Sequence, residues 1–315
     1  MPSGRWLVLA LAGAALFAAG LYLGRGGGQE APEAAEGAPA GQASGDAPPR
    51  RAAPPSEEPA PPPVPTEPEH PVPAGETEPP PVEGPPPPGD GAAVSLVIDD
   101  LGRSVADLDR LAALGVPVTY AVLPFESLTA EVAGVLRERR AEVILHLPME
   151  PSNGADPGPG ALTRAMGGAE LGRATRRALR AVPGAVGVNN HMGSGLSADR
   201  ASMEAVLRVI GERGLYFLDS RTSAESVAFA TARELDIPAA ERQVFLDPDP
   251  RPEAVRHQFR RLLEAARERG AAIAIGHPHP HTLEVLEEEV PLAVERGYRF
   301  VPVSYLLERS SVAAR

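Results

Sequence analysis

From residue 93 onward, short apolar runs alternate with stretches whose apolar residues recur at helical spacing, and this alternation limits the possible folds more than any other feature. The first run, Val94 to Ile98, is short, rich in β-branched residues and soon followed by Gly102, which is typical of a buried strand. Strict alternation of strands and helices predicts parallel strands joined by helical crossovers. We therefore predict an α/β fold with a parallel sheet, of the kind that closes or nearly closes into a (β/α) barrel.

Apolar spacing and stop signals locate the individual elements. Helices are expected at about residues 105–114, 128–139, 169–181, 198–213, 252–269 and 282–295. Strands are expected at about residues 94–98, 116–123, 143–145, 184–190, 215–218, 243–246, 271–275 and 298–303. A loop rich in glycine and proline is expected from Pro148 to Gly168.

Ionisable side chains stand at the carboxyl ends of these predicted strands. They are Asp99, Asp100, His146, His191, Asp219, Asp247 and His277. In (β/α) barrels the active site is built at this end of the strands. Two adjacent carboxylates at a strand exit are costly unless positive charge meets them. The sequence therefore predicts a metal-assisted hydrolytic site at one edge of the sheet.

The residue types suggest a role for each member of this site. Asp100, His146 and His191 can hold a divalent metal, most simply Zn²⁺, that keeps one position open for water and lowers its pKa. Asp99 can then accept the proton of that water, and protonated His277 can deliver one to a leaving amine. Acid and base are thus separate residues.

Each assignment has a structural alternative. Adjacent aspartates also cap helices, although capping needs only one carboxylate. His146 and His191 are equally compatible with buried, hydrogen-bonded histidines. Asp247 lies among Asp-Pro repeats, which are typical of turns.

Four further polar residues near the strand ends are candidates for binding substrate. Glu150 can contact substrate or metal, or anchor the long loop. Asn190 lies beside His191, and Asp219 and Arg221 can contact substrate or pair with each other as a structural salt bridge. His279 and His281 alternate with prolines, which indicates an exposed loop.

The amino terminus indicates export. From Trp6 to Gly24 the chain carries no charge, and Arg5 and Arg25 flank the segment. A run of this length can cross a bilayer as a helix, so we predict a membrane anchor within residues 1–25. The domain that follows would then lie in the periplasm or otherwise outside the cytoplasmic membrane. A cleaved secretory signal with a secreted product is the alternative.

Residues 26–92 are predicted to be a disordered linker rich in Pro, Glu and Ala. The stretch has scarcely any large apolar side chain and cannot form a core. It serves as a spacer or, alternatively, as a ligand for a proline-binding module. It carries twelve acidic and two basic residues, whereas residues 93–315 carry 30 acidic and 26 basic ones. Without a basic stripe, no nucleic-acid partner is expected, and no heptad pattern indicates an oligomer.

Several motifs resemble those of polysaccharide deacetylases, the NodB-homology superfamily. Residues 96–102, Leu-Val-Ile-Asp-Asp-Leu-Gly, resemble its first motif, usually Thr-Phe-Asp-Asp-Gly. Residues 145–150, 189–194, 217–221 and 275–278 are similar to signatures of a divergent branch of that superfamily. This resemblance spans residues 93–308 and implies a distorted barrel of seven or eight strands. It also implies a divalent metal, often zinc, and hydrolysis of acetyl groups on a glycan.

The resemblance carries residue roles over to this chain. Asp99 matches the general base, Asp100 the metal-binding carboxylate, His146 the first metal-binding histidine and His277 the general acid. The usual partner histidine four residues after the first is replaced by Glu150, so His191 is the candidate for the missing imidazole. The usual Arg-Pro-Tyr motif of the middle strands is not visible.

Three functions are compatible with these observations. The first is a membrane-tethered, metal-dependent deacetylase acting on an envelope glycan. The second is an inactive barrel that binds a cell-wall glycan or an envelope partner, since one motif histidine and the arginine motif are missing. The third is a metallohydrolase of another amide, such as a peptide crosslink.

Overall fold

The computed structural model describes residues 91–313. The predicted anchor at residues 1–25 and all but the last two residues of the predicted linker lie outside this range. The first strand begins at Ala93, the first residue of the predicted domain. Among residues 91–313, no helix combines the length and the apolar character needed to cross a membrane.

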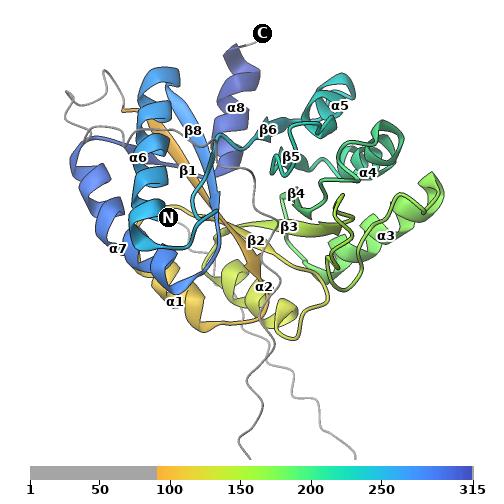
Figure 1. Ribbon diagram of the computed structural model, residues 1–315, viewed down its shortest axis with the longest axis horizontal. Coiled ribbons are helices and arrows are strands. Elements are labelled where there is room, and N and C mark those ends of the chain that lie inside the picture. The colour runs from red at the N-terminus through yellow and green to blue at the C-terminus, as the bar shows by residue number, and fades with distance from the viewer. Residues whose placement is uncertain (1–90, 314–315) are drawn as a thin grey trace, which may run out of the picture. The chain divides into compact units, whose positions relative to one another are not determined.

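The described chain contains strands and helices in nearly strict alternation (Figure 1). The strands are β1 (Ala93–Leu101), β2 (Thr119–Val122), β3 (Glu142–Met149), β4 (Gly187–Met192), β5 (Tyr216–Asp219), β6 (Ala239–Glu241), β7 (Val244–Phe245), β8 (Ala271–Gly276) and β9 (Arg299–Phe300). The helices are α1 (Ala106–Ala113), α2 (Thr129–Glu138), α3 (Gly168–Ala181), α4 (Arg200–Glu212), α5 (Ala228–Glu234), α6 (Pro252–Arg269), α7 (Pro280–Glu295) and α8 (Val303–Ala313).

All strand pairs are parallel, and the strands form one sheet in the order β6-β5-β4-β3-β2-β1-β8-β7, with β9 added beside β1. The sheet curls, and helices pack against its outer face (Figure 1). Its two ends approach each other, because only residues 242–243 join β6 to β7. The parallel α/β fold predicted from the alternation is confirmed, as a curled sheet that stays open between β6 and β7.

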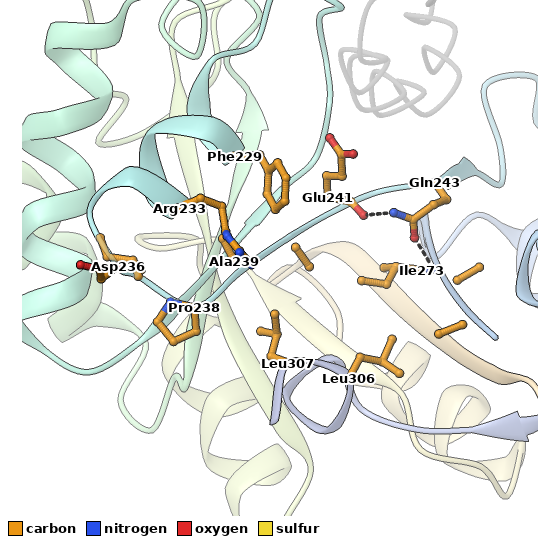
Figure 2. A pocket seen from close by; sticks show the side chains of 14 residues that line it. Phe229, Arg233, Asp236, Pro238, Ala239, Glu241, Gln243, Ile273, Leu306 and Leu307 are labelled. Atoms are coloured by element: carbon orange, nitrogen blue, oxygen red, sulfur yellow. Dashed lines mark hydrogen bonds between the residues drawn. The ribbon is translucent and has the colours of Figure 1, made fainter. Parts of the chain in front are cut away.

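A pocket of about 600 Å³ opens at this seam, between α5, β6, β8 and α8 (Figure 2). Phe229, Ile273 and Leu307 contribute apolar surface to this pocket. The Gln243 side chain forms hydrogen bonds to both β6 and β8. Gln243 Nε2 donates to the Glu241 carbonyl at 2.6 Å, and Gln243 Oε1 accepts from the Ile273 backbone amide at 2.8 Å. The pocket adjoins the amino-terminal end of β8, the opposite end of that strand from His277.

Side-chain alternation along the strands creates two separate cores. The larger cluster lies between the strands and helices α1 to α7. A smaller cluster includes Val97, Ile144, Leu218 and Ile275 together with Val303 of α8, and contains no residue of those seven helices. Since successive strand residues point to opposite faces, the smaller cluster is the inside of the curl. The residues two positions after Val97, Ile144 and Ile275 therefore also face the inside of the curled sheet, at the carboxyl-terminal ends of its strands. These residues are Asp99, His146 and His277.

A polar layer closes the amino-terminal end of the curl. The half-buried Glu142 carboxylate accepts hydrogen bonds from Thr119 Oγ1 at 2.8 Å, Tyr216 Oη at 3.1 Å and the Ser304 amide at 3.3 Å. Burial and the Glu142 charge raise the Tyr216 pKa well above its usual value. Gly187 faces this layer and leaves room for the Tyr216 ring, which a Cβ atom would meet at 2.5 Å. The start of α8 thus plugs the end of the barrel that lies opposite the histidines.

Three elements were not predicted, and several strands extend further than predicted. Neither α5 nor β6 was expected, because both are short and lack a strong apolar period. Helix α8 was also not expected. Its first turn donates a hydrogen bond to the Glu142 carboxylate, a long-range contact that no local pattern reveals. Strands β1, β3, β4 and β5 extend past their predicted ends. Five ionisable residues therefore lie within strands and not after them: Asp99, Asp100, His146, His191 and Asp219.

Candidate active site

The end of β1 brings two adjacent carboxylates into one site. In a regular strand, Asp99 and Asp100 would point to opposite faces. Asp100 instead has φ 57°, and the pairing of β1 with β2 shifts register between Ile98 and Leu101. As a result, His146 Nε2 lies 3.6 Å from Asp99 Oδ2 and 3.2 Å from Asp100 Oδ1. This local left-handed conformation makes a paired-carboxylate site possible.

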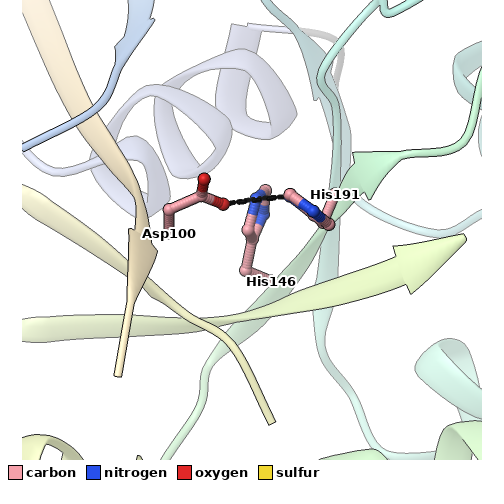
Figure 3. Close-up of side chains that lie close together, drawn as sticks. All are labelled: Asp100, His146 and His191. Atoms are coloured by element: carbon pink, nitrogen blue, oxygen red, sulfur yellow. Dashed lines mark hydrogen bonds and ion pairs between the residues drawn. The ribbon is translucent and has the colours of Figure 1, made fainter. Parts of the chain in front are cut away.

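Three side-chain atoms from three strands converge beside these carboxylates (Figure 3). Asp100 Oδ1 lies 2.9 Å from His191 Nδ1 and 3.2 Å from His146 Nε2, and the two ring nitrogens are 3.0 Å apart. These three residues are the ones predicted as metal ligands. The triangle that they form is named the ligand triangle below.

The ligand triangle fits a divalent metal ion. Asp100 Oδ1 is buried, and among the described residues no group gives it a hydrogen bond of acceptable geometry. A tetrahedral ion about 2.0–2.1 Å from each donor would hold the donors about 3.3 Å apart, close to the separations observed. One carboxylate oxygen and two imidazole nitrogens are also ligands that zinc accepts.

The charges within the ligand triangle support one another. Burial alone raises the pKa of Asp100, but His191 and His146 outweigh this effect and hold that pKa well below its usual range. Burial alone lowers the pKa of His146, but Asp99 and Asp100 outweigh it and raise that pKa. The charge of His277 also lowers the Asp100 pKa, which agrees with the presence of His277 at the same rim.

His277 is held by a second buried aspartate. Its Nδ1 lies 3.0 Å from Asp247 Oδ1, and its backbone amide donates to Asp247 Oδ2 at 2.7 Å. Thr282 Oγ1 also donates to Asp247 Oδ2, at 2.8 Å. Burial raises the pKa of Asp247, but His277 outweighs it, so the net direction is downward. Asp247 therefore orients the His277 imidazole, a role that the sequence did not predict for it.

A second group of possible metal ligands comprises Asp247, His277 and His279. The His279 ring lies 5.5 Å from the His277 ring, centre to centre, and His279 is half-buried, not fully exposed as its proline-rich context suggested. Hydrogen bonds already occupy both oxygens of Asp247, unlike the buried oxygen of Asp100. The ligand triangle is therefore the better metal site of the two.

The structure adds Asn189 to the site, a residue that the sequence analysis missed. Its Nδ2 donates to Asp99 Oδ1 at 2.8 Å and to Ser220 Oγ at 3.3 Å, and its Oδ1 lies 2.9 Å from His146 Nδ1. Strand alternation could have identified it, because on β4 Asn189 shares a face with His191 whereas Asn190 does not.

Asn190 and Asp219, both predicted to bind substrate, are engaged by the protein. Asn190 Oδ1 accepts from the Ser220 amide at 2.9 Å, and its Nδ2 donates to the Met192 carbonyl at 2.8 Å. Asp219 accepts from the Arg221 amide at 2.8 Å and from Ser226 Oγ at 2.7 Å. Both lie one position from an inward-facing residue, which directs them outward to order the loops after β4 and β5.

Glu150 and Arg221 also have protein partners. Glu150 accepts from Arg164 through Nε at 2.9 Å, Nη2 at 2.6 Å and the backbone amide at 2.7 Å. This arrangement supports a loop anchor more than a metal ligand. The Arg221 guanidinium lies 3.6 Å from Glu241 and donates to the Ser226 carbonyl. The alternative of an Asp219–Arg221 salt bridge is therefore wrong, since only the Arg221 backbone meets Asp219.

Strained backbone accompanies this rim. Asp100, Phe125, Met192 and Arg221 all have φ between 51° and 65°, and they lie at or just after the ends of β1, β2, β4 and β5. Such conformations are costly for residues other than glycine and gather at functional sites. Four of the six described non-glycine residues with positive φ thus lie at or near the rim that holds the paired carboxylates.

The curled parallel sheet and its rim of aspartates and histidines define a barrel of the polysaccharide deacetylase superfamily. The chain belongs to the divergent polysaccharide deacetylase family, whose model matches residues 96–307. This result confirms the resemblance of its motifs.

Among known proteins, the chain is 35% identical over 219 residues to the uncharacterized protein YibQ of Escherichia coli (strain K12), covering 70% of this chain and 66% of YibQ. It is 32% identical over 194 residues to an uncharacterized Haemophilus influenzae protein, covering 62% of this chain and 69% of that one. A crystal structure of an uncharacterized Agrobacterium tumefaciens C58 protein matches with a TM-score of 0.64 and 25% identity, covering 72% of this chain and 92% of that one. These relatives support the fold and the family, and the reaction has to be argued from the site.

Proposed function

We propose that the protein is a metal-dependent hydrolase that removes acetyl groups from an envelope glycan. The observation that carries this proposal is the ligand triangle, in which three potential metal ligands from β1, β3 and β4 converge beside Asp99. His191 supplies the imidazole that the missing second-motif histidine would have given. The replacement of that histidine by Glu150 therefore does not by itself remove metal binding.

Asp100, His146 and His191 would hold the metal. When bound, a divalent ion supplies a polarised carbonyl and a water of lowered pKa. Asp99 lies next to the ligand triangle, with Oδ2 3.6 Å from His146 Nε2, and Asn189 holds its other oxygen. Asp99 is therefore suited to take the proton of an attacking water as general base.

His277 is suited to protonate the leaving amine or hydroxyl. Asp247 binds its Nδ1 at 3.0 Å, so Nε2 is the nitrogen that can give up a proton. The buried carboxylate also stabilises the imidazolium, which keeps the acid protonated until the leaving group departs. Water thus loses a proton to Asp99, while the leaving group gains one from His277.

The envelope substrate and the membrane location extend this proposal. The uncharged segment from Trp6 to Gly24 and the proline-rich linker support a catalytic domain held outside the cytoplasmic membrane. Glycan polymers of the cell envelope would be the acetylated substrates within reach there. Zinc is the metal that the donor set favours.

The test uses the purified full-length chain, loaded with Zn²⁺ or Co²⁺ and incubated with N-acetylated glycan fragments. We expect acetate release that Asp99→Asn reduces strongly without releasing the metal. Metal binding without acetate release, combined with cleavage of a peptide amide, would favour the metallo-amidase instead. A chain that binds glycan but no metal would establish the inactive barrel.

A further inference from the structure

The buried side-chain amide of Asn189 connects the proposed metal site to the proposed general base. Asn189 is fully buried on β4 and contacts Asp99, the proposed base, and His146, a proposed metal ligand. Its hydrogen bonds to these side chains measure 2.8 and 2.9 Å. Ser220 Oγ, at 3.3 Å, is its other side-chain partner. The proposed ligand and the proposed base are thus tied to one rigid strand position.

These contacts fix the orientation of the amide. The nitrogen must face Asp99, because a carbonyl oxygen 2.8 Å from a carboxylate oxygen would be repelled. The Asn189 oxygen therefore faces His146 Nδ1, and that nitrogen must carry a proton to donate to it. The His146 nitrogen that points to the ligand triangle is then Nε2, whose lone pair is the one available to a metal.

We infer that Asn189 is a positioning residue with two separable tasks, an inference that rests on the proposed function. Its oxygen selects the metal-binding tautomer of His146, and its nitrogen orients the Asp99 carboxylate. A carboxylate at this position would perform the first task but not the second, because it cannot donate to Asp99. An aliphatic side chain would perform neither. The neutral amide is therefore required where a ligand and a base have to be held together.

The experiment compares Asn189→Asp with Asn189→Ala in the full-length chain. Asn153→Asp is the matched control, since it makes the same change of charge on an exposed loop. Affinity for Co²⁺ alone is measured by its visible absorption, and acetate release gives kcat and KM. Asn189→Ala should lower Co²⁺ affinity about 10–100-fold, the cost of losing a partner of a metal-bound histidine.

Asn189→Asp should separate the two tasks. Its carboxylate still accepts from His146, so Co²⁺ affinity should be at least that of the wild type. Its charge repels Asp99, so kcat should fall on the order of 10²-fold or more with KM little changed. Asn153→Asp should match the wild type in both measurements. Equal losses of affinity in Asn189→Asp and Asn189→Ala would overturn the inference, as would wild-type affinity in Asn189→Ala.

Nitrogen-15 NMR of the metal-free chain, recorded at a pH above the folded pKa of His146 so that the ring is neutral, tests the tautomer independently of activity. The wild type should show a protected Nδ1 proton on His146, assigned by its loss in His146→Gln. This signal should persist in Asn189→Asp and disappear in Asn189→Ala. Its absence from the wild type would refute the inference even if acetate is released. Its presence in a chain that binds no metal would uphold the Asn189 contact and refute the proposed hydrolase.

Discussion

Two of the carboxylates at the rim, those of Asp100 and Asp247, face imidazoles and are engaged in opposite ways. In the ligand triangle, Asp100 presents Oδ1 to two ring nitrogens at 2.9 and 3.2 Å, and that oxygen has no hydrogen bond of acceptable geometry among the described residues. At the other pair, Asp247 accepts three hydrogen bonds, from His277 Nδ1, the His277 amide and Thr282 Oγ1.

This difference indicates what each carboxylate does. A buried oxygen without a hydrogen bond is costly unless a cation meets it, so Asp100 is suited to bind metal. A carboxylate with both oxygens bonded is suited to fix the orientation and tautomer of a histidine. Aspartate–histidine contacts of similar composition are thus suited to metal binding at Asp100 and to proton transfer at Asp247.

Of the substitutions that test this comparison, Asp100→Ala should have the largest effect on metal affinity and acetate release. Asp100→Ala removes one of three ligands and the carboxylate that two imidazoles share. Metal affinity should fall by more than the 10–100-fold that loss of an outer partner costs, and acetate release should fall to background. Metal content after dialysis and acetate release measure this, with Asp156→Ala on the exposed loop as control. Full metal occupancy in Asp100→Ala would remove the distinction between the two carboxylates.

Asp247→Asn should lower turnover and spare the metal. The amide keeps the shape of the carboxylate but cannot stabilise an imidazolium at His277. We expect kcat to fall on the order of 10²-fold or more, while metal affinity stays within about twofold of the wild type. Isothermal titration with Zn²⁺ and steady-state kinetics separate these quantities. A variant that loses metal as readily as Asp100→Ala would show that Asp247 belongs to the ligand set.

The free energy of unfolding of the metal-free chain should also depend on pH, through the groups at this rim. In the metal-free chain the pKa of His146 is raised, so its contribution is present below the unfolded value of about 6.5 and is lost as pH rises through the folded value. The lowered pKa values of Asp100 and Asp247 give contributions that are present above about pH 4 and are lost on acidification. Above neutral pH, the ligand triangle should therefore lose the contribution of His146, while those of Asp100 and Asp247 are already complete.

Thermal unfolding between pH 5 and 8.5, with and without a chelator, tests this expectation. The Tm of the metal-free chain should fall as pH rises through the folded pKa of His146, and Asp100→Asn should flatten this dependence. Metal should reverse the trend, because binding requires neutral imidazoles and strengthens with pH. A metal-free Tm that increases steadily from pH 6 to 8 would contradict the raised pKa of His146.

The sequence was sufficient for the fold class and for the three members of the ligand triangle. Apolar runs of β-branched residues alternating with amphipathic helices require a parallel sheet, and parallel strands bring their carboxyl ends to one rim. That reasoning, together with the family resemblance, located Asp100, His146, His191 and His277. It did not require any knowledge of register.

The remaining roles depended on which face of a strand each residue occupies. Asp219 and Asn190 are at strand ends but face outward, whereas Asn189 faces inward beside His191. Even alternation fails at Asp100, whose left-handed backbone turns it to the same side as Asp99. The orienting role of Asp247 depends on a contact between β7 and β8, which no local pattern reveals.

Substitution of Glu150, another acidic residue near the rim, should give the smallest effect and refine the comparison between Asp100 and Asp247. Glu150, like Asp247, has both oxygens occupied, but its partner is Arg164 and its side chain is 26% exposed. Exposed ion pairs contribute about 0–1 kcal/mol, so Glu150→Gln should lower the free energy of unfolding by no more than about that amount. Metal affinity should not change, since Glu150 lies outside the ligand triangle. Chemical denaturation and Co²⁺ titration measure both, and a lower Co²⁺ affinity would make Glu150 a ligand. A raised KM with unchanged stability would instead restore its predicted role in binding substrate.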